Sequence, residues 1–253
     1  MELQQKVIAI TGAGRGLGRA MAVQFAERGA KLALIDLDQQ GLDVTASLCE
    51  EVGTQARTYV ANVADEQSVA QCFAKIAADF GALHGLVNNA GFTRDGLFVK
   101  VKDGKVVKKM TLEQWQQVVD VNLTGTFLCG REAATQMIET GSQGVIVNIS
   151  SISRHGNMGQ TNYTATKAGV QAMAVTWAKE LARYGIRAAA IAPGYIGTEM
   201  VMSMKPEARE KISSMIPAQR LGKPEEVAKT AVFIFENDYI NGRCLEVDGA
   251  LRV

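Results

Sequence analysis

The chain has 253 residues, enough to bury a substantial core in one α/β domain or in two small ones. Its 47% hydrophobic and 21% charged residues are typical of a soluble globular protein. The formal net charge of +1 argues against binding to nucleic acid or to an anionic membrane. The four cysteines are scattered, without a CxxC motif or a cluster with histidine. We therefore expect reduced thiols, no metal site, no signal peptide, no membrane span and a cytoplasmic protein.

The first predicted strand, residues 6–11, is a β-branched run typical of a strand buried on both faces. It leads into a glycine-rich turn with the spacing G-x-x-x-G-x-G, and a helical pattern begins within the turn. Such a unit forms an anion site, because free backbone N–H groups and the helix dipole point towards a pyrophosphate. We therefore expect a dinucleotide cofactor to contact Gly12, Gly14, Arg15, Gly16, Leu17 and Gly18.

The second predicted strand, residues 31–35, ends in Asp36, about 20 residues beyond the glycines. A carboxylate at this position can bind both ribose hydroxyls of an adenosine, and it would repel a 2′-phosphate. Leu37 offers no cation to offset that repulsion, whereas Arg15 could reach a 2′-phosphate from the glycine-rich turn. The sequence therefore favours NAD(H), with NADP(H) as the alternative.

Strands and helices alternate along the rest of the chain. Further strands are predicted at 56–61, 85–87, 144–149, 187–192 and 244–247, with helices between them. This alternation specifies a single Rossmann-type domain of class α/β, with a doubly wound parallel sheet of seven strands flanked by helices. Ligands of such sheets bind at the carboxyl ends of the strands, which is where Asn62 and Asn88 fall.

Residues 97–110 break this regularity. Apolar and basic residues alternate around Asp103-Gly104, a pattern that predicts a β-hairpin with a tight turn. The five lysines of this segment have two interpretations. The favoured one is an edge hairpin that lysines keep soluble, and the other is a contact with an anionic substrate or carrier.

Thr111 and Gln114 have the form of a capping box, which predicts the start of a long helix over 111–139. Asn122 is a polar residue inside the otherwise apolar stripe of this helix. Because buried polar groups need partners, Asn122 is either satisfied locally or part of the site.

Tyr163 and Lys167 stand four residues apart, so on a helix they lie on one face, one turn from each other. A fixed ammonium nearby favours the phenolate, which lowers the pKa of the phenol and makes Tyr163 usable as an acid or base. A hydroxyl from the preceding turn, that of Ser150 or Ser151, could hold the oxygen that gains or loses the proton.

Together these motifs resemble the short-chain dehydrogenase/reductase family, and within it the β-ketoacyl-(acyl-carrier-protein) reductase group is most similar. The resemblance covers nearly the whole chain. It rests on the run from Thr11 to Gly18, Asp36, the run from Asn88 to Gly91, Asn122, Ser150-Ser151, Tyr163 with Lys167, and Pro193-Gly194 with Thr198.

The resemblance implies a role for each of these residues. Tyr163 would exchange a proton with the substrate oxygen, Lys167 would lower its pKa and hold the nicotinamide ribose, and Asn122 would hold a water of a proton relay. Strand register makes Ser151 the serine that fixes the substrate oxygen, whereas counting back from the tyrosine makes it Ser150. The implied cofactor contacts are Asn62 and Val63 at the adenine, Asn89, Ala90 and Gly91 at the adenosine and ribose, and Pro193, Gly194, Ile196 and Thr198 towards the nicotinamide.

The expected function is hydride transfer between a nicotinamide cofactor and a ketone or secondary alcohol. The favoured substrate is a 3-oxoacyl thioester of coenzyme A or acyl carrier protein, and the alternative is a small polyol, steroid or other hydroxy compound. A catalytically silent NAD-binding sensor or scaffold is the alternative of another class, but the intact Asn122, Ser151, Tyr163 and Lys167 argue against it. The family also implies a homotetramer built partly from helices 111–139 and 160–184. From the chain itself we expect a short helix after Lys205, over 206–216, to form part of a substrate flap at about 195–218.

Overall fold

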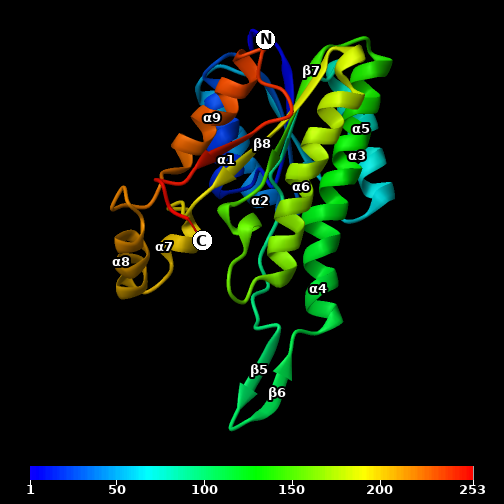
Figure 1. Ribbon diagram of the computed structural model, residues 1–253. Coiled ribbons are helices and arrows are strands. Elements are labelled where there is room, and N and C mark those ends of the chain that lie inside the picture. Colours follow the sequence, from blue (N-terminus) through cyan, green and yellow to red (C-terminus); the bar gives the residue numbers. More distant parts are fainter. Residues whose placement is uncertain (253) are drawn as a thin grey trace.

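A parallel sheet of seven strands forms the centre of the molecule, in the order β3-β2-β1-β4-β7-β8-β9 (Figure 1). The structure, a computed structural model, describes residues 1–252, with Met200 described by its backbone alone. The strands are β1 (Val7–Thr11), β2 (Lys31–Asp36), β3 (Ala56–Val60), β4 (Gly85–Asn88), β7 (Gly144–Ile149), β8 (Ile186–Pro193) and β9 (Cys244–Val247). The predicted seven-stranded, doubly wound Rossmann-type sheet is confirmed.

Helices cover both faces of the sheet. One face carries α1 (Gly16–Ala26), α2 (Gln39–Glu51) and α9 (Pro224–Glu236), and the other carries α3 (Glu66–Phe80), α5 (Gly125–Glu139) and α6 (Thr161–Glu180). Alternate residues of β1 enter the two cores, since Ile8 and Ile10 pack on the first face and Val7 and Ala9 on the second. In the first core Phe25 and Phe235 make an edge-to-face contact with ring centroids 4.8 Å apart.

The helix predicted over 111–139 is interrupted. The capping box of Thr111 and Gln114 opens α4 (Leu112–Val119), but residues Asp120–Thr124 then form a π-helical turn before α5 begins. Asn122 lies in this turn, and its carbonyl accepts a hydrogen bond of 2.8 Å from Thr126 Oγ1. The prediction of one regular helix was therefore wrong at its centre, because one widened turn leaves the apolar pattern on either side unchanged.

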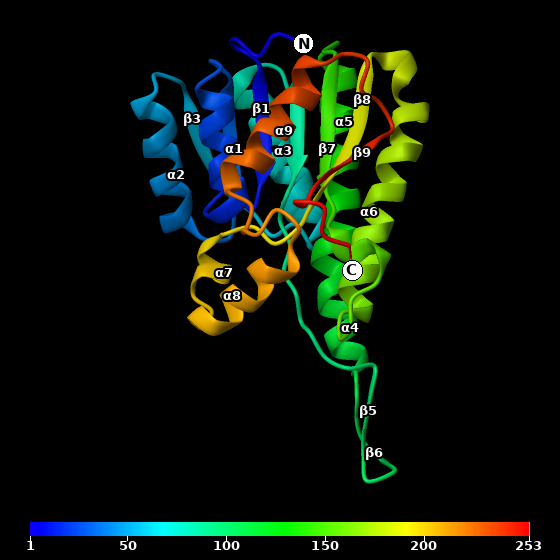
Figure 2. The ribbon, with the colours of Figure 1, turned by 60° about the vertical axis from the view of Figure 1, so that its left-hand side comes forward.

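Residues 97–110 form a hairpin of β5 (Val99–Lys102) and β6 (Lys105–Lys109) that projects from the body as a separate two-stranded sheet (Figures 1 and 2). Asp103 and Gly104 take φ values of +50° and +73°, the left-handed pair that a type I′ turn requires. The hairpin does not lie at an edge of the central sheet, so the edge interpretation was wrong in that respect.

Two short helices follow β8, namely α7 (Glu199–Met202) and α8 (Pro206–Met215). They lie at the end of the molecule where the strands of the central sheet finish (Figure 2). Ile216, directly after α8, forms a small apolar cluster with Ile152 and Leu251. Within residues 1–252 no helix is long and apolar enough to cross a membrane.

Candidate active site

A cavity of about 800 Å³ opens at the carboxyl ends of β1, β2, β4 and β7, a size typical of small-molecule and cofactor sites. It runs from Asp36 past the glycine-rich turn to Tyr163. The predicted residues that line it are Gly12, Arg15, Gly16, Leu17, Asp36, Asn62, Val63, Asn89, Ala90, Gly91, Tyr163, Lys167 and Thr198. Residues from six separate stretches of the chain thus meet at one edge of the sheet.

The glycine-rich turn is shaped by close packing of its backbone. Gly12 has φ +65°, and a Cβ atom at Gly18 would lie only 2.0 Å from the Gly12 carbonyl oxygen. Arg15, the N-cap residue of α1, makes no side-chain capping hydrogen bond, so the first backbone N–H groups of this helix can serve a ligand beside Gly12 and Gly16 in the cavity wall. This cradle of amides fits the diphosphate of a dinucleotide.

Asp36 closes the cavity at the end of β2. Its Oδ2 accepts a hydrogen bond of 2.9 Å from Gly14 N, and its Oδ1 accepts from Leu37 N at 2.7 Å and Asp38 N at 3.2 Å. Three backbone donors therefore hold the carboxylate in place, and its remaining lone pairs are free for the hydroxyls of a ribose. Arg15 lines the same cavity.

Asn89 joins the end of β4 to the glycine-rich turn. Its Nδ2 donates to the carbonyls of Thr11 and Gly12, both at 3.0 Å, while Thr11 Oγ1 accepts from the backbone N–H groups of Asn89 and Ala90. The amide N–H groups of the Asn89 side chain therefore hold the turn in place. Asn89 and Ala90 also form part of the cavity wall.

Tyr163 and Lys167 lie on α6, one turn apart as predicted. Lys167 is 5% exposed, and its Nζ donates a 2.7 Å hydrogen bond to the Ile149 carbonyl and lies 5.5 Å from the centre of the Tyr163 ring. Burial lowers the pKa of Lys167 to about 8. Burial also raises the pKa of the Tyr163 phenol to about 12, although a hydrogen bond with Ser151 opposes the rise. The expected lowering of the phenol pKa by Lys167 is therefore wrong for this structure, because desolvation dominates and Lys167 is not among the groups that oppose it.

Ser150 and Ser151 have different surroundings. Ser150 is buried, and its Oγ donates a 2.7 Å hydrogen bond to the Lys167 carbonyl. Ser151 Oγ instead accepts from Ser153 N at 3.1 Å and is hydrogen-bonded to the Tyr163 phenol. Only the Ser151 hydroxyl meets Tyr163, which agrees with the strand-register argument, while Ser150 holds the backbone of α6.

The side chain of Asn122 is satisfied locally. Its Oδ1 accepts from Phe92 N at 3.0 Å, and its Nδ2 donates to the Phe92 carbonyl at 2.9 Å. This amide pairing fixes the loop after β4. A Cβ atom built on Gly91 would lie 3.1 Å from Asn122 Oδ1 and 3.6 Å from Lys167 Nζ, so Gly91 occupies the space between the two side chains.

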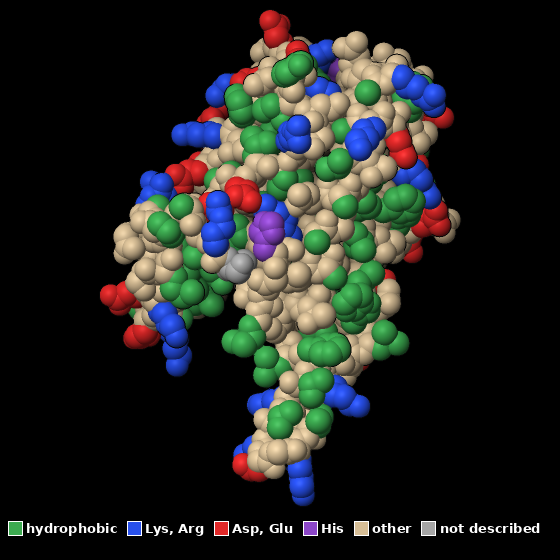
Figure 3. Space-filling view, in the orientation of Figure 1, with side chains coloured by type: hydrophobic (Ala, Val, Ile, Leu, Met, Phe, Trp, Pro, Cys, Tyr) green, Lys and Arg blue, Asp and Glu red, His purple; other side chains and the backbone are tan. Residues whose placement is uncertain are grey.

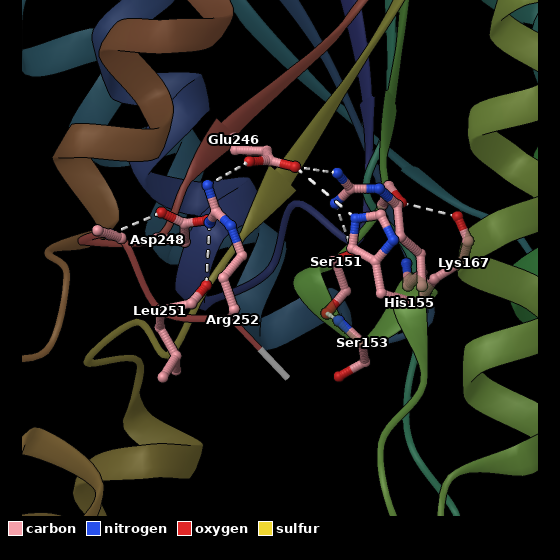
Figure 4. A network of polar contacts seen from close by, with 11 residues as sticks. Ser151, Ser153, His155, Lys167, Glu246, Asp248, Leu251 and Arg252 are labelled. Carbon is pink, nitrogen blue, oxygen red and sulfur yellow. Dashed lines mark hydrogen bonds and ion pairs between the residues drawn. The ribbon is translucent and has the colours of Figure 1, made fainter. Parts of the chain in front are cut away.

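Sequence reasoning missed the support of Ser151, which Figure 4 shows from close by. Arg154 donates to the Ser151 carbonyl twice, from its backbone N at 3.2 Å and from Nη1 at 3.1 Å. The Nη2 of the same guanidinium, whose side chain is 6% exposed, pairs with Glu246 at the end of β9. Glu246 also pairs with Arg252 at 3.1 Å and lies 3.8 Å from His155 Nε2. Partial burial would raise the pKa of Glu246, but the hydrogen bond from Arg154 and the charges around it lower that pKa.

Some predicted cofactor residues stand behind the cavity wall. Among the described residues, Gly14, Gly18, Pro193, Gly194 and Ile196 are not part of the lining. Gly194 N donates to the Val247 carbonyl at 2.9 Å, which joins the ends of β8 and β9. Ile196 is buried and bridges to Gly222. These positions shape the site, and direct contacts of theirs with a cofactor remain a prediction.

The lining also contains residues that were not predicted: Ile35, Leu37, Ala61, Phe92, Thr93, Val121, Ile149, Glu199 and Ser203. Phe92 and Thr93 directly follow the predicted run that ends at Gly91, so sequence adjacency could have found them. Glu199 likewise follows the predicted Thr198, but its ion pair could not be found from adjacency. It lies 3.5 Å from Arg19 Nη1 and thereby ties α7 to α1 across the cavity.

Comparisons with known proteins agree with this geometry. A family model described as enoyl-(acyl carrier protein) reductase matches residues 12–251. The chain is 41% identical over 256 residues to a 3-oxoacyl-(acyl-carrier-protein) reductase of Thermotoga maritima, covering 100% of both chains. It is 42% identical to an acetoacetyl-CoA reductase of Synechocystis sp., covering 98% of this chain and 97% of the other. The crystal structure of a levodione reductase superimposes with a TM-score of 0.86 at 35% identity, covering 97% of each chain. The chain belongs to the short-chain dehydrogenase/reductase family.

Proposed function

We propose that this protein reduces the 3-oxo group of an acyl thioester with a nicotinamide cofactor, NADH in preference to NADPH. The observation that carries the proposal is the pairing of Tyr163 with Ser151 beside the buried Lys167. Tyr163 and Lys167 line the same cavity as the amide cradle and Asp36. The substrate class is supported by the names of the two relatives, which act on 3-oxoacyl and acetoacetyl thioesters.

The cofactor would supply a hydride to the carbonyl carbon of the substrate. Tyr163 would donate its phenolic proton to the carbonyl oxygen, and Ser151 Oγ would donate a hydrogen bond to the same oxygen and hold it at the phenol. A phenol whose pKa is about 12 is fully protonated at neutral pH, so it is ready to act as an acid. The same phenol would take the proton back in the reverse reaction, so the reductive direction is proposed from the relatives' names.

Lys167 would hold the cofactor ribose near this proton. Its Nζ donates one hydrogen bond, to Ile149, and an ammonium has two further donors that could serve a ligand in the cavity that Lys167 lines. Asn122 would act as a positioning residue, because its side chain holds the backbone of Phe92 in the cavity wall. The proposed proton relay would pass beside Gly91, which separates Asn122 from Lys167.

The preference for NADH is argued from Asp36. Three backbone donors hold its carboxylate at the cavity wall, where it would face the ribose 2′-position of a bound cofactor. The neighbouring Leu37 is exposed and apolar. Two anions without a cation between them repel each other in the partly desolvated cavity. Arg15 is the group that could offset this repulsion.

Reduction of a small ketone without a thioester is the second candidate function. The structural likeness to a levodione reductase favours it, since the same fold surrounds the active site of that enzyme. The two candidates are separated by substrate, because a thioester carries a long pantetheine arm that a small ketone lacks.

The test is the initial rate of acetoacetyl-CoA reduction, with NADH and NADPH side by side. Turnover should be higher with NADH, and Tyr163→Phe should reduce it by at least 10³-fold while NADH still binds. Tyr184→Phe is the matched control. Tyr184 is exposed and does not line the cavity, so this variant should be fully active. Turnover of levodione but not of acetoacetyl-CoA would favour the small-ketone function, and substantial activity of Tyr163→Phe would refute the mechanism.

We also propose a homotetramer acting in the cytoplasm. Apolar side chains stay exposed along α4 and α5, namely Leu112, Phe127 and Ile138, and the free thiols of Cys49, Cys72 and Cys129 are buried. Exposed apolar side chains on these two helices would be covered in the proposed assembly. Light scattering should give four times the mass of one chain, and the mass of a monomer would refute the assembly.

A further inference from the structure

The hairpin of β5 and β6 concentrates the positive charge of the molecule. Five lysines and one aspartate give it a formal charge of +4, whereas the whole chain has +1, so the remaining residues together carry −3. Every residue from 97 to 109 is exposed, and the arm extends into solvent (Figures 1 and 3). The charge is therefore displayed on an arm and is not spread over the body.

The register of the hairpin sorts its side chains onto two faces. Lys100 opposes Lys108 and Lys102 opposes Lys105, which places these four lysines on one face of the ribbon. On the other face Val101 opposes Val106, and Val107 is the extra residue of a β-bulge beside them. We call the first of these the lysine face.

Like charges that oppose each other directly destabilise a hairpin. A two-stranded hairpin is marginally stable in water, and this one has two such lysine pairs. If the lysines served only to keep the arm soluble, they would do so equally well when distributed over both faces of the hairpin. Pairing them on one face is unfavourable for the free hairpin and favourable once an anionic surface lies against it.

The base of the arm is attached to the catalytic loop. Gly96 N donates to the Gly159 carbonyl at 2.8 Å, Asp95 Oδ2 accepts from Gln160 Nε2 at 3.1 Å, and Asn162 Nδ2 donates to the Arg94 carbonyl at 3.1 Å. These bonds hold residues 94–96 against the segment that leads directly into Tyr163. The arm projects from the end of the molecule where the strands finish and the cavity opens (Figure 2).

We propose that the lysine face binds an acidic carrier protein that delivers the acyl thioester to the cavity. The proposal rests on the proposed function and adds to it the surface on which the carrier docks. Four lysines on two rungs, about 7 Å apart along the strands, match a patch of carboxylates on a protein surface. A thioester of coenzyme A bound in the cavity would not reach the tip of the arm, whereas a carrier protein is large enough to contact both. Exposed ion pairs contribute little each, so the main effect of the lysines is faster, steered association.

The experiment compares two double variants that lose the same charge. Lys102→Gln with Lys105→Gln removes one rung of the lysine face, and Lys179→Gln with Lys229→Gln removes two exposed lysines of the body. Acetoacetyl groups are presented on an acidic acyl carrier protein and on coenzyme A. We expect kcat/KM for the carrier-bound substrate to fall at least fivefold in the hairpin variant alone, with the coenzyme A substrate changed less than twofold. The wild-type advantage on the carrier should shrink as salt is raised.

Direct binding separates this proposal from the proposed function. Titration of the unacylated carrier protein, followed by fluorescence anisotropy, should give a Kd at least five times weaker for the hairpin variant than for the wild type and the control. Wild-type protein that binds the carrier but turns over neither substrate would refute the proposed function and leave the docking surface supported. Equal binding by all three proteins, or an equal loss on carrier and coenzyme A substrates, would overturn the docking proposal. A change of oligomeric mass in the hairpin variant would likewise overturn it, since the arm would then contact a second copy of the chain.

Discussion

Replacement of Arg154 by glutamine tests how the reactive hydroxyl is held in place. In the protein, Arg154 binds the Ser151 carbonyl through both its backbone N and Nη1, and its Nη2 is anchored on Glu246. Glutamine keeps the backbone bond but cannot span both the Ser151 carbonyl and Glu246. The Ser151 carbonyl should therefore keep one of its two hydrogen bonds from residue 154 and lose the other. Arg154 itself makes no contact with the hydroxyl of Ser151 or the phenol of Tyr163 in the hydrogen bonds described.

The size of the effect follows from the bonds that are lost. A hydrogen bond from a charged donor contributes about 1.5–3 kcal/mol, and the guanidinium is almost fully buried, so little solvent screening reduces this value. If most of that free energy serves to hold Ser151 at the phenol, kcat/KM falls about 10- to 150-fold, since 1.4 kcal/mol is a factor of ten. The Ser151 hydrogen bond lowers the pKa of Tyr163, so a displaced Ser151 should raise the phenol pKa further.

The assay is kcat/KM for acetoacetyl-CoA between pH 6 and pH 10, in a double-mutant cycle with Ser151→Ala. If Arg154 acts through Ser151, Arg154→Gln has little further effect in the Ser151→Ala background. Arg252→Gln is the matched control, because Arg252 also pairs with Glu246 but does not touch Ser151. Losses that simply multiply in the double variant would refute the reasoning, as would a fully active Arg154→Gln protein. An unchanged pH profile together with a lower melting temperature would show a role in stability alone.

Three further changes test the cofactor end, the buried lysine and the core. Asp36→Ala should narrow the ratio of kcat/KM for NADH over NADPH at least tenfold, and an unchanged ratio would assign cofactor choice to Arg15. Lys167→Met should abolish turnover and yet raise the free energy of unfolding at pH 7 by up to about 3 kcal/mol. Burial holds the pKa of Lys167 at about 8, below its ordinary 10.5, so the gain in stability is largest below pH 8 and disappears above pH 10.5. Urea titrations below pH 8 and above pH 10.5 that give the same gain would contradict this prediction. Phe235→Ala should lower the free energy of unfolding by about 3–5 kcal/mol, and a loss under 1 kcal/mol would mean that the core beside Phe25 collapses around the gap.

The parts of the site that could be predicted from sequence are those fixed by the ends of buried strands. A parallel strand between two layers of helices has a single register in which its apolar residues are buried, so the residue that follows it is placed with it. Asp36, the last residue of β2, and Asn89, directly after β4, therefore reached the cavity wall. The same reasoning selected Ser151 over Ser150, and the structure puts only Ser151 against the phenol.

The parts that could not be predicted depend on geometry without a local pattern. One extra residue in a helical turn changes no apolar period, so the π-helical turn around Asn122 left no mark in the sequence. The hairpin was visible as two strands, but its separation from the central sheet depends on which edges are already paired. The pKa of Tyr163 was predicted in the wrong direction, because sequence spacing shows the nearby ammonium and does not show how much water both groups lose.

The pairing of Arg154 with Glu246 shows why such supports are found only in three dimensions. The two residues are 92 positions apart, on a turn after β7 and at the end of β9, and neither stands in a recognisable motif. They meet because β8 lies between these strands and brings both carboxyl ends to one edge of the sheet. The motif residues were therefore accessible to sequence reasoning because each follows its own strand. The residues that hold them in place depend on the order of strands in the sheet. That order brings the end of β9, the last strand, within reach of the turn after β7 that carries Ser151.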